Sequence, residues 1–292
     1  MSGERNPSPP AFASGAYMYS HGGTVTTLAK KYQAIYKTAG GVRGSLGWPV
    51  SAPTCTLPGG GCSMAFDHGT LYLPKTGTGY SVSNDAIAAA YAAKGGISGS
   101  LGWPRTNTTL IATTANGSGY AQGFIGGYIY TSSLGTFTFD VAGQQAYAAA
   151  GGVRGALGWP KADPVCDATG CTQAFQAGIL YIPKTGKPFA VTESRIATYY
   201  ADHGGQAGSF GYPTTNTVLS ITTKNGRGYA QAFTGGYIYA TSLGTYAVTG
   251  PILVKYRAAK AQNGIYGFPK SDATCDSGVC TQTFAHGTIK TP

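Results

Sequence analysis

Apolar residues along this chain follow two alternating periods. In alanine-rich segments they recur one helical turn apart, which predicts short amphipathic helices. In GTLYL (69–73) and GGYIY (126–130) apolar and polar residues alternate, as in a strand with one buried face. Glycine-rich turns separate the two kinds of segment, so we expect small helix-and-strand units. The helical pairs are Ile87/Tyr91, Ile196/Tyr200 and Ile252/Tyr256.

A Gly-aromatic-Pro signature marks each unit. It occurs five times, and successive prolines are 53 to 56 residues apart. The decapeptides GGVRGSLGWP (40–49) and GGVRGALGWP (151–160) differ at a single position. Self-similarity at a fixed period predicts a repeat architecture. The five copies are LGWP at 46–49, 101–104 and 157–160, FGYP at 210–213 and YGFP at 266–269.

Other positions recur in register with the signature prolines. Every unit has a tyrosine thirteen residues before the proline, a glycine five residues before it and a phenylalanine after it. The tyrosines are Tyr36, Tyr91, Tyr147, Tyr200 and Tyr256. The glycines are Gly44, Gly99, Gly155, Gly208 and Gly264, and the phenylalanines are Phe66, Phe124, Phe175, Phe233 and Phe284.

Each unit is predicted to run from a helix through a turn and a hairpin to a third strand. A residue such as Asp140 caps the helix, and Gly-Gly stops it in the first four units. The signature proline keeps the residues after it out of a central strand. The predicted fold class is therefore α+β and strand-dominated, with five tandem repeats of about 55 residues each.

The two ends of the chain predict that the repeats close on themselves. FASGAYMYS (12–20) aligns with the third-strand segment FDHGTLYLP (66–74), and FAHGTIKTP (284–292) is a further copy. Six copies of this strand against five turns predict a closed propeller-like ring with pseudo-five-fold symmetry, with an open solenoid as the alternative. A disordered lead-in would occupy 1–11 and a single domain 12–292. Its units would be about 25–80, 81–137, 138–190, 191–247 and 248–292, the last completed by 12–24.

The six cysteines form three close pairs, which lie only in the first, third and fifth units, here called the odd units. The second and fourth units, the even units, carry Asn116-Gly117 and Asn225-Gly226 at the same place, a strong hairpin signal. We expect a disulfide across each short odd hairpin, with zinc, which needs four converging ligands, as the competing interpretation. Disulfides indicate an oxidising location outside the cytosol. The pairs are Cys55/Cys62, Cys166/Cys171 and Cys275/Cys280.

Composition and charge narrow the class of protein. The 292 residues include 46 glycines and 21 tyrosines, and only 10% are charged. The net charge of +10 is scattered along the chain, which argues against a nucleic-acid binder and favours a soluble surface with a mild attraction for anions. No apolar run approaches the roughly eighteen residues of a membrane helix. The start of the chain shows no signal-peptide pattern. No cofactor is expected, and the chain is expected to be a monomer.

The signature and its period resemble tandem LGFP repeats. The resemblance covers roughly residues 12 to 292 and includes the downstream segments of the form xQxF and GxIY. In that family the repeats occur in secreted cell-envelope proteins, C-terminal to mycoloyltransferase domains or beside peptidoglycan hydrolases. The resemblance implies a cell-wall-binding role, with arabinogalactan as the expected ligand. Two features depart from the family pattern: the aromatic residue that leads the copies at 210–213 and 266–269, and the cysteines of the odd units.

An enzyme would need acid, base or nucleophilic groups that converge. Neither Gly-x-Ser-x-Gly nor His-Glu-x-x-His occurs. His68 and His286 occupy one column of two different units, so they are not expected to meet. We therefore expect no enzyme and no metal site. A cryptic hydrolase or transferase using a carboxylate such as Asp67, or a structural protein-interaction ring, are the alternatives. Two acidic pairs recur as turn devices, Asp163/Asp167 and Asp272/Asp276.

Binding of a polysaccharide suits a repeated scaffold, because weak sites on one chain act together. Alternation places Tyr128 and Tyr130 on one strand face and Ile129 on the other, so these tyrosines face either a groove or the next unit. Glutamines before the phenylalanine bond either the neighbouring backbone or a sugar hydroxyl. The candidate ligand-binding residues are Tyr72, Tyr128, Tyr130, Tyr181, Tyr237, Tyr239, Gln122, Gln173, Gln231, Gln282, Arg43 and Arg154.

The signature aromatics form a second set of candidates. An aromatic face can pack on the C–H face of a sugar, but the exchange of Trp, Tyr and Phe in this column fits packing against the proline at least as well. We therefore expect the signature to set the geometry of the units. The residues are Trp48, Trp103, Trp159, Tyr212 and Phe268.

Overall fold

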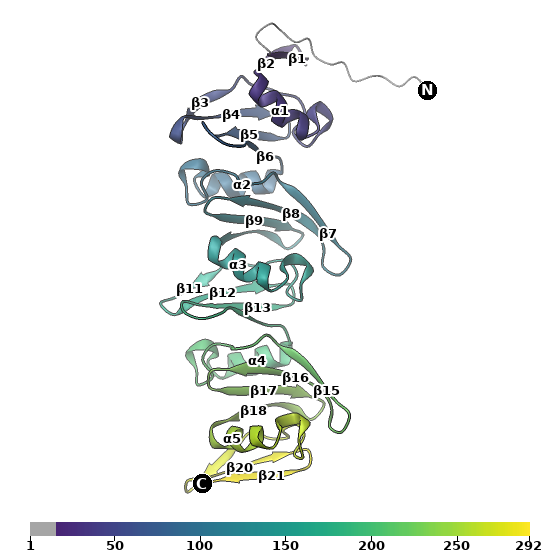
Figure 1. Cartoon of the computed structure of the whole chain (residues 1–292), viewed down its shortest axis with the longest axis vertical. Coiled ribbons are helices and arrows are strands. Elements are labelled where there is room, and N and C mark those ends of the chain that lie inside the picture. Colours follow the sequence, from purple (N-terminus) through teal and green to yellow (C-terminus); the bar gives the residue numbers. More distant parts are fainter. Residues whose placement is uncertain (1–15) are drawn as a thin grey trace, which may run out of the picture. The chain divides into compact units, whose positions relative to one another are not determined.

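The computed structural model describes residues 16–292 (Figure 1), so the predicted lead-in at 1–11 lies outside the described residues. The chain divides into two compact units, Met1–Gln144 and Gln145–Pro292, which are described separately below. Small antiparallel sheets dominate both. The prediction of a strand-dominated fold with one helix per repeat is confirmed.

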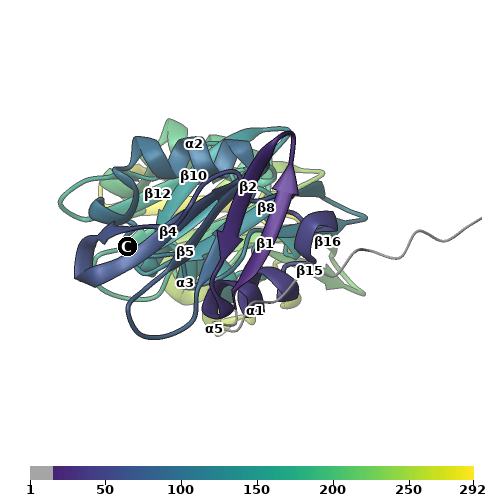
Figure 2. The ribbon, with the colours of Figure 1, turned by 90° about the horizontal axis from the view of Figure 1, so that it is seen from above.

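The first compact unit holds three sheets. Its helices are α1 (Lys30–Thr38), α2 (Asp85–Ala93) and the start of α3 (Val141–Ala149), within which the boundary falls. Figure 2 looks down on the first, two-stranded sheet. The sheets are β1 (Tyr17–His21) with β2 (Thr24–Leu28); β3 (Thr54–Leu57), β4 (Gly61–Phe66), β5 (Gly69–Leu73) and β6 (Tyr80–Val82); and β7 (Thr109–Thr113), β8 (Gly117–Phe124), β9 (Gly127–Ser132) and β10 (Gly135–Asp140).

The second compact unit also holds three sheets, with the rest of α3, α4 (Ser194–Asp202) and α5 (Gly250–Ala258). The last sheet has three strands and the other two have four. The strands are β11 (Val165–Cys166), β12 (Gly170–Phe175), β13 (Gly178–Pro183) and β14 (Phe189–Val191); β15 (Val218–Thr222), β16 (Gly226–Phe233), β17 (Gly236–Thr241) and β18 (Gly244–Thr249); and β19 (Thr274–Asp276), β20 (Val279–Phe284) and β21 (Gly287–Thr291).

Each repeat is a helix followed by a sheet whose strands pair in chain order. Repeat one runs from α1 to β6, repeat two from α2 to β10, repeat three from α3 to β14, repeat four from α4 to β18 and repeat five from α5 to β21. The expected hairpin and third strand are present in all five. Repeats one to four also have a fourth strand, which the sequence interpretation missed.

Helices and sheets alternate within each compact unit. Ile87 and Tyr91 of α2 pack against Val82 of the preceding sheet and against Phe124 and Ile129 of their own. In the second unit α4 lies in the same way between the sheets of repeats three and four, and α5 between those of repeats four and five. Each of these three helices therefore packs in a core that two sheets share, which couples the repeats on either side.

The glycine column explains how each helix ends. Gly40, Gly95, Gly151 and Gly204 adopt left-handed backbone with φ between 84° and 93°, as the Gly-Gly stop predicts. A 3₁₀ turn follows, and in repeat five Lys260 takes the left-handed position. A Cβ added at Gly264 would lie 1.6 Å from the Ala259 carbonyl oxygen. The turns are Gly41–Arg43, Gly96–Ser98, Gly152–Arg154, Gly205–Ala207 and Ala261–Asn263, with a further one at Pro58–Gly60.

The recurring tyrosine and proline close the unit. In each repeat the tyrosine hydroxyl donates to the carbonyl of the glycine two residues before the signature proline. The distances run from 2.5 Å for Tyr36 to 2.7 Å for Tyr256. Each signature proline forms a β-bridge with the recurring phenylalanine, as Pro213 does with Phe233. The signature therefore joins the end of the helix to the second strand.

The hairpins confirm the predicted split between odd and even repeats. Disulfides Cys55–Cys62, Cys166–Cys171 and Cys275–Cys280 span the odd hairpins. In the even repeats the turn residues Gly117 and Gly226 are left-handed, with φ of 76° and 79°. Asp140 caps α3 by accepting from the Gly143 N–H at 2.6 Å.

Closure of the repeats into a ring stays a prediction. In the described residues β1, which was expected to complete repeat five, pairs with β2 instead. The sheet of repeat five consists of β19, β20 and β21. The structure therefore shows the repeated sheets, and their closure into a ring is not shown.

Candidate functional site

The predicted third-strand tyrosines lie mainly between repeats. Tyr130, Tyr181 and Tyr239 are 2–6% exposed, and Tyr72 is half-buried. Tyr72, Tyr181 and Tyr239 each make an edge contact with the core tyrosine of the next helix, at centroid distances of 5.5 to 5.9 Å. Tyr130 donates to Gln144 of α3 at 2.9 Å. Burial raises the pKa of Tyr130 and Tyr181 to about 12.

The remaining tyrosines of that set are half-buried. Tyr128 stacks on Tyr130, and Tyr237 stacks on Tyr239. The Arg257 guanidinium lies 5.8 Å from the centre of the Tyr237 ring. Alternation therefore predicted which residues share a face, and the face itself is covered by the next repeat.

The predicted glutamines bond the backbone, the first of the two alternatives. All four are at most 1% exposed. Gln122 Nε2 donates to the carbonyls of Ser81 and Thr106, both at 2.9 Å. Gln282 Nε2 donates to those of Ala247 and Ser271 at 2.7 and 2.8 Å. These amides hold neighbouring segments together and present no group to a ligand. Gln231 bonds Ala190 and Thr215, and Gln173 bonds Ala162.

A second polar column, which the sequence interpretation missed, completes this joint between repeats. Asn107, Asn216 and Asp272 each stand three residues after a signature proline and accept an N–H from the fourth strand of the preceding repeat. The donors are Ser81, Ala190 and Ala247, at 2.8 to 2.9 Å. The carbonyl groups of Ser81, Ala190 and Ala247 also accept a hydrogen bond from the glutamine Nε2 of the next repeat. The Pro-x-x-Asn/Asp spacing could have revealed this column.

The carboxylates considered for a cryptic enzyme have structural partners. Asp67 accepts from the Trp48 N–H at 3.0 Å. The prediction of Asp272 as a turn device is wrong, because Asp272 accepts from the Ala247 N–H and the Tyr199 hydroxyl of repeat four, both at 2.8 Å. Asp167 accepts from the Thr169 hydroxyl and N–H and from the Gly170 N–H, and the Thr169 hydroxyl is the main cause of a lowered Asp167 pKa.

Three further observations bear on function. Arg43 and Arg154 are exposed at the ends of their 3₁₀ turns. Over residues 16–292 no three His, Cys, Asp or Glu side chains are grouped so as to hold a metal ion. In the same part of the chain, no helix has the length and apolar character needed to cross a membrane.

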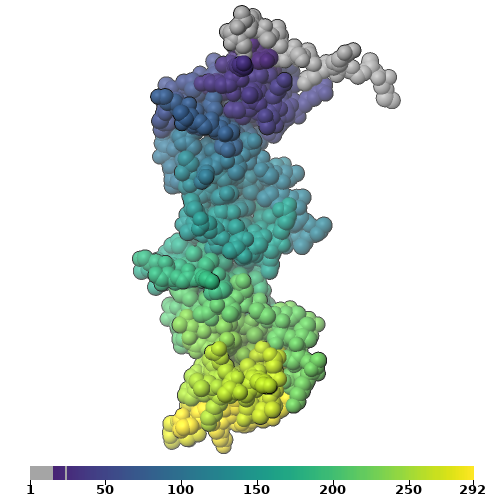
Figure 3. Space-filling view, in the orientation of Figure 1, coloured from purple at the N-terminus to yellow at the C-terminus, as the bar shows by residue number. Residues whose placement is uncertain are grey.

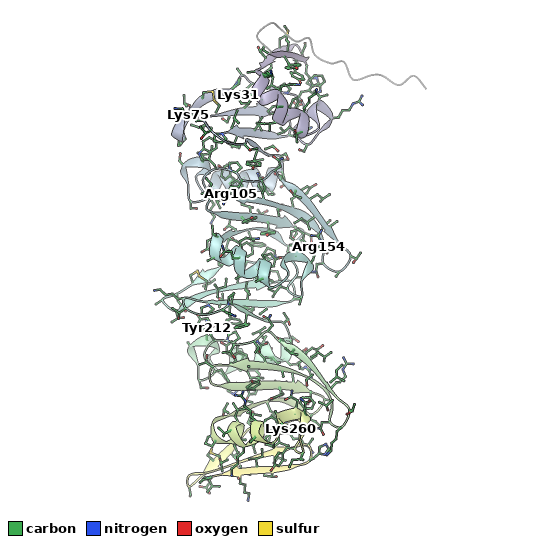
Figure 4. All side chains as sticks on the ribbon, in the orientation of Figure 1. Lys31, Lys75, Arg105, Arg154, Tyr212 and Lys260 are labelled. Atoms are coloured by element: carbon green, nitrogen blue, oxygen red, sulfur yellow. A yellow bond between two sulfur atoms is a disulfide. The ribbon has the colours of Figure 1, made fainter. Side chains whose placement is uncertain are left out.

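An open cleft of about 580 Å³ lies where repeat three meets repeat four. Its walls come from the β11–β12 hairpin, the loop between β13 and β14, and the signature loop with Tyr212. The hairpin and loop form a teal-green lobe in the space-filling view (Figure 3), and Tyr212 is labelled beside them in Figure 4. The polar and aromatic lining includes Thr169, Lys184, Lys187, Phe189, Gln206 and Tyr212.

Hydrogen bonds fix the aromatic wall of this cleft. The hydroxyls of Tyr212 and Thr169 lie 2.9 Å apart. The Lys184 N–H donates to the Thr169 carbonyl at 2.7 Å, which ties the loop to the hairpin. A Cβ added at Gly170 would lie 2.8 Å from the Tyr212 hydroxyl, so glycine lets the ring pack against the hairpin. A half-exposed ring, hydroxyls, an amide and two ammonium groups thus surround one open space.

Part of this construction recurs at the junction of repeats one and two. Trp103 takes the place of Tyr212, and a Cβ added at Gly61 would lie 2.1 Å from the Trp103 ring. The loop Pro74-Lys75-Thr76-Gly77 corresponds to Pro183-Lys184-Thr185-Gly186. Lys75 and Arg105 are labelled at this junction in Figure 4. We call these two places the odd–even junctions.

A second cleft, of about 520 Å³, lies along the long hairpin of repeat four. Leu219, Tyr229 and Leu243 line its apolar part. Its Arg195 pairs with Glu193 at 2.7 Å and donates to the Thr241 carbonyl at 2.8 Å. With this guanidinium engaged, the exposed Arg227 is the cation left to this cleft among the described residues, against Lys184 and Lys187 in the cleft beside Tyr212.

Five helix-and-sheet units joined by recurring contacts define a tandem-repeat protein. The family model described as LGFP repeat matches residues 46–99, 157–208 and 210–264, more than half of the chain. The chain therefore belongs to the LGFP repeat family. The third match begins at the aromatic-led copy FGYP, so this departure lies within the family's range.

Two other comparisons add little. No curated protein matched the chain. Among solved structures, the crystal structure of an extracellular domain from B. thetaiotaomicron has 9% sequence identity and a TM-score of 0.16. The match covers 82% of this chain and 29% of that one. A score this low carries no argument about fold or function.

Proposed function

We propose that this chain is a non-catalytic, secreted module that binds cell-wall polysaccharide, an arabinogalactan-like glycan, and anchors its host to the wall. The observation that carries the proposal is the cleft beside Tyr212. Its half-exposed ring offers a face for the C–H surface of a sugar, and its hydroxyl and amide groups can orient sugar hydroxyls.

Three further features support the proposal. The three disulfides suit a location outside the cytosol. Membership of the LGFP family suits a cell-wall-associated protein. Two odd–even junctions on one chain could bind one polymer together, so that weak sites give useful retention. The carboxylates that an enzyme might have used are engaged in turns and joints, which favours binding over catalysis.

The test is a binding titration with purified arabinogalactan and a sedimentation assay with whole cell walls. Wild-type protein should bind both. Tyr212→Ala should weaken binding by about tenfold, because it removes the sugar-facing ring of one odd–even junction. The matched control is Tyr120→Ala, which removes an exposed tyrosine of β8. If the wild-type protein binds neither the glycan nor the walls, the proposal is wrong.

A further inference from the structure

Two lysines in the cleft beside Tyr212 carry unpaired charge. Lys184 and Lys187 line the cleft and are exposed. Neither ammonium group has an ion-pair partner among residues 16–292. The nearby carboxylate of Asp167 is held in its turn by Thr169 and Gly170. The cleft therefore presents positive charge beside an aromatic ring and hydroxyl groups.

The junction of repeats one and two also has two cations, but one of them stands at a different position in the repeat. Lys75 corresponds to Lys184. The second cation is Arg105, at the position of Thr214, whereas Thr78 stands at the position of Lys187. One basic position has been lost and another gained, so the sequence keeps two cations among the positions that line the cleft beside Tyr212 in repeats three and four.

The opposite junctions, where an even repeat meets an odd one, lack this feature. The loops between the third and fourth strands there read Ser-Leu-Gly, at 133–135 and 242–244, and contain no cation. Of the basic groups near the second of them, Arg227 is exposed in the second cleft and two others are engaged. Arg195 is paired with Glu193, and the Lys255 ammonium donates to the Lys290 carbonyl at 2.7 Å. Among the described residues, the second cleft thus presents one cation without an ion-pair partner, Arg227, whereas the cleft beside Tyr212 presents two.

We propose that the odd–even junctions select a polyanionic glycan, one with phosphate or carboxylate groups repeated along its chain. The cations Lys75 with Arg105, and Lys184 with Lys187, bind the anionic groups, while Trp103 and Tyr212 contact the sugar or polyol units. This inference rests on the proposed polysaccharide-binding function and, in place of a neutral arabinogalactan, makes an anionic glycan the preferred ligand. Because ammonium–anion contacts in an open cleft are screened by salt, binding should weaken as ionic strength rises.

The test compares three polymers of similar length: poly(glycerol phosphate), polygalacturonate and neutral arabinogalactan. The variant Lys75→Gln/Lys184→Gln removes one cation from each junction. The matched control Lys37→Gln/Lys224→Gln removes two exposed lysines elsewhere, one from each compact unit. We expect a polyanion to bind at least about tenfold more tightly than the neutral polymer, and the junction variant to lose that advantage while the control keeps it.

Each outcome has a distinct meaning. A preference for the phosphate or for the carboxylate polymer identifies the source of the anion. Equal affinity for all three polymers, unchanged in the junction variant, overturns the polyanion proposal and leaves polysaccharide binding intact. Absence of binding to every polymer and to walls overturns the proposed function itself. Equal binding of duplex DNA, unaffected by Tyr212→Ala, would reveal a general charge effect and would also overturn the proposal.

Discussion

Odd and even repeats build the same hairpin in different ways, and the two hairpins make different contacts with the next repeat. The long hairpin of repeat four reaches the next repeat, where Asn225 Nδ2 donates to the carbonyls of Gln262 and Gly264 at 2.8 and 3.0 Å. The short hairpin of repeat three is closed by a disulfide and leaves an open cleft beside Tyr212. The long hairpin contributes to a joint and also borders the second cleft, whereas the short hairpin borders the cleft beside Tyr212.

The signature aromatics follow the same division. Trp103 and Tyr212, which stand at the odd–even junctions, are half-buried. Trp159 and Phe268 of repeats three and five are each 1% exposed. The signature aromatic is therefore half-buried in the even repeats and fully buried in these odd repeats, where Phe268 also borders the second cleft.

The glutamine joint also differs between the two classes. In even repeats the glutamine Oε1 accepts a hydroxyl, from Thr108 in repeat two and Thr217 in repeat four. The corresponding residues of repeats three and five are Pro164 and Ala273. Among the described residues the Oε1 atoms of Gln173 and Gln282 accept no hydrogen bond. The even joints are therefore more completely bonded.

The largest effect is expected from a change that both classes share. Burial raises the pKa of Tyr130 and Tyr181 to about 12 from 10.0, so the folded state favours their protonated form. Their contribution to stability is complete below pH 10 and is lost as the pH rises through about 12. Thermal unfolding followed by circular dichroism should show the midpoint falling steeply over this window. A midpoint that stays constant to pH 12 would contradict this expectation.

The joint can be tested by placing methionine in the glutamine column, where repeat one already carries Met64. Gln231→Met leaves the Thr217 hydroxyl and the carbonyls of Ala190 and Thr215 without this partner, and should lower the free energy of unfolding by about 3 kcal/mol. Gln282→Met, which loses no hydroxyl partner, should cost about 2 kcal/mol. Urea unfolding measures both. Equal losses would remove the distinction between even and odd joints.

The disulfides should matter only to the odd hairpins. Cys166→Ser/Cys171→Ser removes the constraint on a short loop, which the chain-entropy model values at about 2 kcal/mol. Amide exchange of β11 and β12 should become faster. The matching hairpin of repeat four, β15 with β16, serves as the internal control and should keep its exchange rates. Faster exchange in both hairpins would show that the Cys166–Cys171 disulfide also stabilises the hairpin of repeat four.

The smallest effect is expected from the contact that the even hairpin makes with the next repeat. Asn225→Ala removes both hydrogen bonds to the turn of repeat five and should cost about 1 kcal/mol. Lys224→Ala, a change at the neighbouring exposed position, is the matched control and should stay within about 0.5 kcal/mol of wild type. If amide exchange near Gly264 is unaltered in Asn225→Ala, the hairpin does not support the joint.

Local features of this fold were predictable because each depends on residues close together in the chain. The left-handed stop at Gly40, the cap at Asp140 and the Asn-Gly turns follow from backbone stereochemistry. The disulfides follow from spacing. The fourth strand was not predicted, because in repeat one it is only three residues long, Tyr80–Val82, and follows an exposed loop.

The candidate site was less predictable, because its composition depends on what covers each face. Alternation correctly grouped Tyr128 with Tyr130 but could not reveal that α3 lies against Tyr130. In the same way, the glutamine column was recognised without its partner, the fourth strand of the preceding repeat. The cleft beside Tyr212 arises between two repeats, so neither repeat's sequence contains it alone.

The alternation of hairpins has a consequence for how such chains can lengthen. A single repeat inserted into the array would place two odd or two even hairpins in succession, so one open cleft or one Asn-mediated contact would be missing. A block of two repeats restores both kinds of neighbour. The near-identity of 40–49 and 151–160, which lie two repeats apart, is what growth by paired duplication would leave. Arrays of this design should therefore gain or lose binding clefts one per inserted pair.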